Sequence, residues 1–215
     1  MTIVWQRFKE GTMLALRADR LPRTVWGSNL RAFLPRGRWQ ELSRSTAERA
    51  GQECEVCGRG PGDRAGLDCN EMWEFLDSDG AHVQRLVGVI AMCEWCHLTQ
   101  HSGRADMNGR YDDVVAALTG VNRWTQLRAV RDITASETEF EERSRFDWDM
   151  DLSVLAGWFE LPDESGLLVP VDRRVLLGNS HTKARAEIRP VFTGEVPDGV
   201  WEWDERLPLR PKDDR

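Results

Sequence analysis

Four of the five cysteines form two pairs with the same spacing. Cys54 and Cys57 make one Cys-x2-Cys pair, and Cys93 and Cys96 make the other. Each pair can bring two thiolates to one side of a tight turn, and two such turns complete a tetrahedral four-sulfur site for zinc. In a chain expected to carry no export signal, disulfides explain the odd cysteine count poorly. We therefore predict a structural zinc ion, because the alternative of four buried or redox-active cysteines needs two identical spacings by coincidence.

Two histidines follow the second cysteine pair closely. His97 comes directly after Cys96, and His101 lies four positions further on. Residues four apart share one face of a helix, so both imidazoles could reach one metal ion if a helix begins here. The alternative is that both are ordinary polar residues in the first turns of that helix.

The segment LDCNEMWEF, residues 67–75, alternates apolar and polar side chains in the manner of a strand. Its centre is the polar tripeptide Cys-Asn-Glu, which a strand selected only for packing would seldom contain. The turn sequence DSDG (77–80) and the apolar segment 82–93 come next. We therefore predict a strand, a turn and a second, more deeply buried strand that ends at the second cysteine pair.

Helical patterns flank this pair of strands. The apolar spacing over 38–50 predicts a short helix, with Gly51 as its C-terminal stop. Three further helices are expected after the second cysteine pair, at 97 to about 105, near 111–118 and near 125–145. Beyond residue 161, short apolar segments separated by Gly, Pro, Asn and Asp predict a small β-rich region. The predicted fold class is therefore α+β.

This order of elements resembles the HNH nuclease family, whose ββα-metal motif has a general-base histidine on its first strand and metal ligands on its helix. Four segments resemble a bacterial group of zinc-containing HNH endonucleases, over roughly residues 26–155: WGSNLRAFLPRGRWQEL, CEVCGRGPG, HVQRLVGVIAMCEWCHLTQH and SRFDWDMDLSVL. The resemblance implies a ββα-metal core stapled by the four-cysteine site, with flanking helices. It divides the chain into a basic N-terminal arm (1–37), a zinc-stapled HNH-like domain with a helical extension (38–160) and a small β-rich C-terminal region (161–215).

The resemblance also implies roles for individual residues. The four paired cysteines match the structural zinc ligands of the group. His97 matches the closing histidine of the HNH motif, a ligand of the catalytic metal, and His101 matches a second histidine of the same helix. With Asn70 at the general-base position, these histidines complete the expected catalytic set. The catalytic ion would be Mg²⁺, Mn²⁺, Ni²⁺ or Zn²⁺.

The general-base position departs from the family, because Asn70 stands where relatives carry the histidine of Cys-His-Glu. In the HNH mechanism a neutral imidazole takes a proton from the water that attacks the phosphodiester, while a metal steadies the developing charge. An amide can orient a water molecule but cannot accept its proton. General-base help is worth roughly 10²- to 10⁴-fold in rate. We therefore predict a metal scaffold with impaired cutting, and whether Asn70 is natural or introduced stays open.

Other positions bear on the same question. The middle Asn of the motif is absent, since Gly88 lies at about its place, and Gln100 stands where relatives tend to carry Lys. Two residues could replace the missing base, His82 after the turn and Glu71 on the first strand. Glu71 should point to the opposite face of that strand and would need a bulge to help. Cys69, the unpaired thiol, is interpreted as a small core residue.

Ten tryptophans are many for 215 residues. We expect most of them to fill the core, among them Trp73, Trp95, Trp124, Trp148 and Trp158. Trp26 and Trp39 lie among arginines and could instead contact bases or sugars, although core packing is the favoured interpretation for them as well.

The formal net charge of −7 argues against indiscriminate binding to nucleic acid but leaves local binding possible. Residues 14–50 are rich in arginine, and residues 131–165 are rich in aspartate and glutamate. The resemblance implies DNA as a partner, with candidate contacts at Arg31, Arg36, Arg38 and Arg104. The alternative is a solvated charged surface without a polyanionic partner.

No apolar segment approaches the roughly 20 residues of a membrane span, and the N-terminal residues do not resemble a signal peptide. We therefore expect a cytoplasmic protein without a membrane partner. The predicted function is an HNH-type, metal-dependent nuclease that acts on DNA with an impaired centre. The alternative is a catalytically inactive zinc protein that binds nucleic acid or a protein partner. A homodimer and a protein partner bound through residues 161–215 stay open.

Overall fold

The computed structural model describes residues 14–60, 66–78, 80–162, 164, 166–171, 188–197 and 210–211. The segments RRVLL (173–177) and VWEW (200–203), for which strands are predicted, lie outside these residues, as does the beginning of the N-terminal arm. The described residues form both helices and strands, so the prediction of an α+β chain is confirmed.

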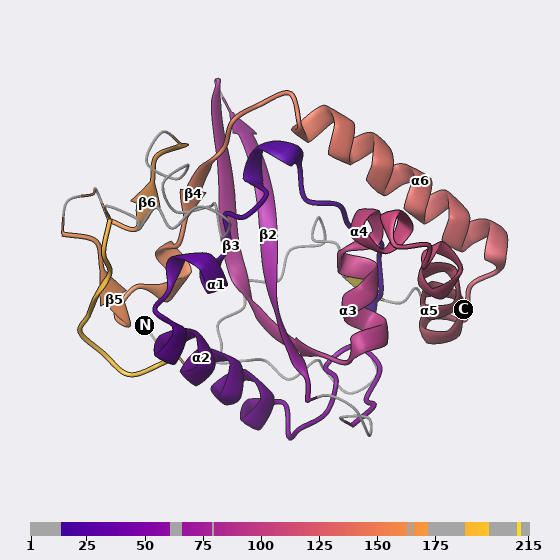
Figure 1. Cartoon of the computed structure of the whole chain (residues 1–215), viewed down its shortest axis with the longest axis horizontal. Coiled ribbons are helices and arrows are strands. Elements are labelled where there is room, and N and C mark those ends of the chain that lie inside the picture. Colours follow the sequence, from indigo (N-terminus) through magenta and orange to yellow (C-terminus); the bar gives the residue numbers. More distant parts are fainter. Residues whose placement is uncertain are drawn as a thin grey trace.

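A long antiparallel hairpin runs through the middle of the molecule (Figure 1). β2 (Asp68–Ser78) and β3 (Ala81–Met92) pair from end to end, which confirms the predicted strand, turn and strand. Gly80 lies in the turn with a φ of +81°, a left-handed conformation that glycine adopts without steric cost. A shift in register between Met72 and Trp73 interrupts the ladder.

The sheet continues on the β3 side of the hairpin. β3 pairs in parallel with β4 (Asp149–Asp151), and β4 pairs antiparallel with β6 (Leu168–Val169). The strand order β2-β3-β4-β6 leaves β2 at an edge of the sheet. Two small antiparallel pairs lie apart from this sheet: β1 (Leu14–Ala15) with β8 (Arg210–Pro211), and β5 (Phe159–Glu160) with β7 (Val191–Phe192).

Helices lie on both sides of the hairpin and give the described residues two apolar clusters (Figure 1). On one side are α1 (Leu30–Phe33) and α2 (Arg36–Arg49). On the other side are α3 (Glu94–Gln100), α4 (Ser102–Met107), α5 (Tyr111–Asn122) and α6 (Gln126–Arg143). Two single-turn helices, η1 (Arg23–Val25) and η2 (Ser153–Leu155), lie in the connections. Alternate residues of β2 therefore face different clusters, with Met72 in one and Trp73 in the other.

The predicted helices α2, α5 and α6 are confirmed, and Gly51 ends α2 with a φ of +65°. The helix expected to continue from His97 to about 105 is interrupted at His101, where α3 has ended and α4 has not begun. The cause is a strand-like segment from elsewhere in the chain. The Ser102 amide donates to the Asp19 carbonyl, and Thr99 accepts from the Asp19 amide, so the regular helical ladder cannot continue.

Residues 16–20 form an extended segment, the N-terminal strap, which packs on these helices. The Asn122 side chain accepts from the Leu16 amide and donates to the Leu16 carbonyl, both at 2.7 Å. Asp132 accepts from the Ala18 amide at 2.7 Å. Part of the predicted N-terminal arm is thus held by buried side chains of α5 and α6.

The tryptophans divide between the core and the surface. Trp73, Trp148 and Trp158 are buried, and Trp124 packs against a core cluster as predicted. Trp95 is 40% exposed, so its assignment to the core is wrong. Trp26 is 58% exposed and stacks on Phe140, so the favoured interpretation of Trp26 as a core residue is also wrong. No helix in the described ranges has the length and apolar character to traverse a bilayer.

Candidate metal sites and their cleft

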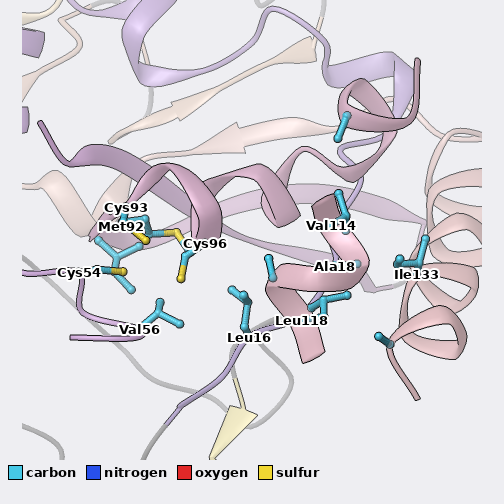
Figure 2. Packing of buried hydrophobic residues seen from close by; sticks show 14 of the residues in the cluster. Leu16, Ala18, Cys54, Val56, Met92, Cys93, Cys96, Val114, Leu118 and Ile133 are labelled. Atoms are coloured by element: carbon cyan, nitrogen blue, oxygen red, sulfur yellow. The ribbon is translucent and has the colours of Figure 1, made fainter. Parts of the chain in front are cut away.

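The four paired cysteines converge from two parts of the chain, as predicted. Their sulfur atoms all lie within 4.8 Å of one another, and the Cys57 and Cys93 sulfurs are 3.6 Å apart. Two thiolates on one tetrahedral zinc ion are about 3.8 Å apart, so the arrangement fits this metal. Figure 2 shows three of these side chains, Cys54, Cys93 and Cys96, together beside the apolar cluster.

Each cysteine pair lies on a tight turn that the backbone closes. In the first, the Cys54 amide donates to the Arg59 carbonyl and the Gly58 amide donates to the Cys54 carbonyl, both at 2.8 Å. Gly58 supports this turn with a φ of +71°. In the second, Cys93 ends the hairpin and Cys96 lies in the first turn of α3.

The sulfur cluster favours thiolates at some positions. Hydrogen bonding with the Cys54 thiol lowers the pKa of Cys57 to about 6, and the same kind of contact lowers the pKa of Cys93 while raising the pKa of Cys54 and of Cys96. Thiolates are the form that binds metal. The cluster therefore has the donor type, number and spacing of a structural zinc site.

The fifth thiol does not join this cluster. The Cys69 sulfur donates to the Thr46 hydroxyl at 3.6 Å, and burial raises the pKa of Cys69 to about 12. Cys69 packs against the core cluster on the α2 side of the hairpin. This placement agrees with its interpretation as a packing residue.

His97 and His101 come together despite the break in the helix. Their Nε2 atoms are 3.2 Å apart, and the rings meet edge to face. Two imidazole nitrogens that share one metal ion are about 3.0–3.4 Å apart, so the pair fits a common ion. Burial, followed by the nearby charges of His97 and Arg104, lowers the pKa of His101 to about 4. The imidazole is thus neutral near pH 7, as a metal ligand must be.

Asp68 contacts this histidine pair and is a residue that the sequence did not predict for the site. Its Oδ2 atom lies 3.0 Å from Nδ1 of His97, and the hydrogen bond from His97 lowers the pKa of Asp68. A carboxylate bound to one ring nitrogen leaves the other nitrogen aimed at a metal. The available signal was position, because Asp68 lies two residues before Asn70 and thus on the same face of the strand.

Asn70 lies beside this group and is almost buried, with 5% of its surface exposed. Its Nδ2 donates to the Glu71 carbonyl at 3.2 Å and contacts the Met72 sulfur at 3.4 Å. The arrangement offers hydrogen bonds but no basic nitrogen at this position.

Glu71 points to the other side of β2, as alternation predicts. Its carboxylate accepts from the Leu30 amide at 2.8 Å and from the Trp73 indole at 3.1 Å. Burial raises the pKa of Glu71 to about 7, although these hydrogen bonds act against the increase. The register shift of β2 lies after Met72, so it does not turn Glu71 toward Asn70.

One cleft of about 330 Å³ contains these residues at the edge of the sheet. Asp68, Asn70, His97, Gln100 and His101 line it, together with Arg31, Trp39 and Arg104. Glu71 also lines it, because β2 is an edge strand, but its carboxylate is bound by the Leu30 amide and the Trp73 indole. Arg31 and Arg104 are exposed at this cleft. The other two candidate contacts do not line it, and Arg38 pairs instead with Glu41 and lies over the Phe192 ring. The Gln100 side-chain amide donates to the Arg17 carbonyl and so helps to hold the N-terminal strap in place.

His82 lies too far from the cleft to replace the missing base. It pairs with Asp77 at the turn end of the hairpin, whereas Asn70 pairs with Ile90. Eight residues of strand, about 26 Å, separate His82 from Ile90. His82 stacks on Phe146 with ring centroids 4.1 Å apart.

Comparison of the chain with protein-family models, with curated proteins and with solved structures yields no match.

Proposed function

We propose that this protein is an HNH-type, metal-dependent nuclease that acts on DNA, with a centre impaired by Asn70. The main support for this proposal is that Asp68, His97 and His101 lie together beside Asn70 in one cleft. Its elements follow the order strand, turn, strand and helix, and a four-cysteine cluster lies at the start of the helix. We propose zinc for that cluster and a ββα-metal core for the hairpin with α3.

In this proposal His97 and His101 hold the catalytic divalent ion, and the Asp68 carboxylate fixes the ring of His97. When bound, such an ion supplies stabilisation of the negative charge that develops at a phosphodiester. Asn70 positions the attacking water by hydrogen bonds but leaves its proton in place. Arg31 and Arg104 would contact the flanking phosphates, since their guanidinium groups suit phosphate oxygens.

The second candidate is a catalytically silent zinc protein that binds nucleic acid or a partner. Two observations favour it: an amide at the base position, and a Glu71 carboxylate committed to Leu30 and Trp73. The two candidates differ only in whether the cleft can still cut when its base is restored.

Replacing Asn70 with His tests the proposed nuclease. Supplied with Mn²⁺, Mg²⁺, Ni²⁺ or Zn²⁺, Asn70→His should nick supercoiled plasmid about 10²- to 10⁴-fold faster than the native chain. The added imidazole would accept the proton of the attacking water. The rate of conversion from supercoiled to open-circular plasmid is the measurement.

His97→Ala in the Asn70→His background is the control, and it should abolish the gain by removing a metal ligand. Thermal unfolding and zinc content must match the native chain for both variants. If Asn70→His is folded and zinc-loaded yet cuts neither plasmid nor single-stranded DNA, the nuclease is excluded and the binding protein is supported.

A further inference from the structure

A second concave surface shares no lining residue with the cleft. This knuckle groove has a volume of about 680 Å³ and lies between the first cysteine turn and α5. Its lining residues are Cys57, Arg59, Trp95, Ala116, Ala117, Gly120, Val121, Asn122 and Arg123.

One aromatic side chain, that of Trp95, lines the knuckle groove and is partly exposed to solvent. Trp95 lies between the two cysteines of the second pair, and the turn leaves 40% of its surface exposed. The next residue, Cys96, is fully buried, so the turn fixes the tryptophan backbone firmly. The exposed indole offers a flat face for stacking.

Two arginines add positive charge to this groove in a chain with a net charge of −7. Arg59 and Arg123 are both exposed, and neither has a carboxylate partner within the ranges that the structure describes. Arg110, by contrast, pairs with Glu94 and Asp113 on the same helices. Among the described residues, the groove therefore offers two guanidinium groups without a carboxylate partner to an anionic ligand.

Arg123 adopts a backbone conformation that usually favours glycine. Arg123 ends α5 with a φ of +57°, in the left-handed region where glycine is the usual choice. A residue with a Cβ pays a steric cost there, of order 1 kcal/mol. Retaining arginine at this place puts a cation at the rim of the groove that glycine would not supply.

Small residues of α5 line part of the groove and leave space there. Ala116 is exposed, and a Cβ added at Gly120 would meet no atom within 4 Å. Residues 116 and 120 of α5 therefore leave open space in the groove that Trp95 also lines.

We propose that the knuckle groove binds a single-stranded segment of nucleic acid. One unpaired base stacks on Trp95, and Arg59 and Arg123 bind the adjacent phosphates. A single strand fits because its bases are free to stack, whereas a duplex hides their faces. The inference rests on the proposed function in one respect, the choice of nucleic acid as the partner, and it needs neither cleavage nor the histidine pair.

The test measures binding of fluorescein-labelled single-stranded DNA of about 15 nucleotides by fluorescence anisotropy. The zinc-loaded native chain is used without added catalytic metal. Trp95→Ala should raise the Kd about tenfold, as expected for the loss of one base–aromatic stack. Arg59→Ser with Arg123→Ser should also weaken binding, and should lower the slope of log Kd against log salt concentration by about 1.4. Blunt duplex of the same sequence should bind more weakly than the single strand.

Matched controls are an exposed apolar residue and an exposed arginine outside both concave surfaces. Leu127→Ala and Arg44→Ser should leave the Kd unchanged. Because Trp95 and Arg59 adjoin zinc ligands, Ala116→Glu serves as a second variant that places a negative charge in the groove from α5. It should weaken DNA binding with zinc content and thermal stability unchanged.

The inference is wrong if the groove variants bind DNA as the native chain does, or if the control variants weaken binding equally. It is also wrong if the native chain binds a poly-glutamate peptide through these residues and binds no DNA. Plasmid cleavage by Asn70→His is scored separately. Cleavage without groove-dependent binding removes this inference alone, whereas groove-dependent binding without cleavage removes the nuclease alone.

Discussion

At the residue scale, the cleft depends on side chains that alternate along β2. Asp68 and Asn70 share the face of the strand that meets His97 and His101. Glu71, the residue after Asn70, points to the opposite face of the strand, where its carboxylate accepts a hydrogen bond from the Leu30 amide of α1. The same strand thus orients the His97 ring on one side and anchors a short helix on the other.

Asp68→Asn should weaken binding of a divalent ion by about 10- to 100-fold, because an amide holds the His97 ring less firmly than a carboxylate. Isothermal titration with Ni²⁺ into chain already loaded with zinc at the cysteines is the measurement. Asp77→Asn is the matched control, since Asp77 approaches His82 at 3.4 Å at the far end of the hairpin. Equal affinities for both variants and the native chain would show that Asp68 does not position a ligand.

Glu71→Gln should reduce the dependence of stability on pH. The folded-state pKa of Glu71 is raised to about 7 by burial, so the folded chain holds this proton more tightly than the unfolded chain. Its contribution to stability is therefore present below about pH 4.5 and is lost as pH rises to 7. Across this interval the native chain should lose about 2–3 kcal/mol that Glu71→Gln does not lose.

Urea unfolding of both proteins at pH 5.5 and pH 8 measures this difference. The comparison cancels the titration of the cysteines and histidines, which both proteins share. If the two proteins change in parallel between these pH values, the Glu71 carboxyl is not perturbed in the folded chain.

At the element scale, α3 is set at both ends by other parts of the chain. The cysteine cluster joins its first turn to the loop after α2 and to the end of β3. The N-terminal strap takes the hydrogen bonds at its last turn, which places His101 at the break before α4. The relation between the two histidines therefore depends on the cysteine cluster as well as on helical spacing.

Cys57→Ser should release the zinc and lower the Tm by at least about 10 °C, because a structural zinc ion contributes folding free energy directly. Elemental analysis and thermal unfolding are the measurements, with about one zinc per native chain expected. Cys69→Ser is the matched control, since Cys69 only donates to Thr46 and a serine hydroxyl can do the same. Loss of zinc from both variants, or from neither, would contradict the four-cysteine site.

At the scale of the whole molecule, contacts between distant parts of the sequence fix the helices beside the hairpin. Asn122 binds both backbone groups of Leu16 across 106 residues, and Asp132 binds Ala18 across 114. Arg17 also forms an ion pair with Asp132. The N-terminal strap thus belongs to the same folded unit as α3 to α6.

Asn122→Ala should destabilise the chain by about 2–4 kcal/mol, because it leaves a buried amide and a buried carbonyl of Leu16 without partners. Urea unfolding at pH 7 is the measurement. Thr125→Ala, which removes the exposed N-cap of α6, should cost only about 1 kcal/mol. A smaller loss for Asn122→Ala than for Thr125→Ala would show that the strap does not hold these helices.

The local features of this protein follow from residues that are close together in the chain. Alternation predicted the hairpin, apolar spacing predicted α2, α5 and α6, and repeated spacing predicted the cysteine cluster. These features depend on residues close together in the chain or on a short motif, so their physical cause is visible in the sequence.

Which residues share a site depends on the packing of segments that are distant in sequence. This packing brought Asp68 to His97, broke the helix at His101, kept Arg31 and Arg104 at the cleft without Arg36 and Arg38, and exposed Trp95. Each result arises from packing between segments that are far apart in sequence, such as the strap against α3. Neither periodicity nor spacing carries that information, because both describe neighbours along the chain rather than neighbours in space.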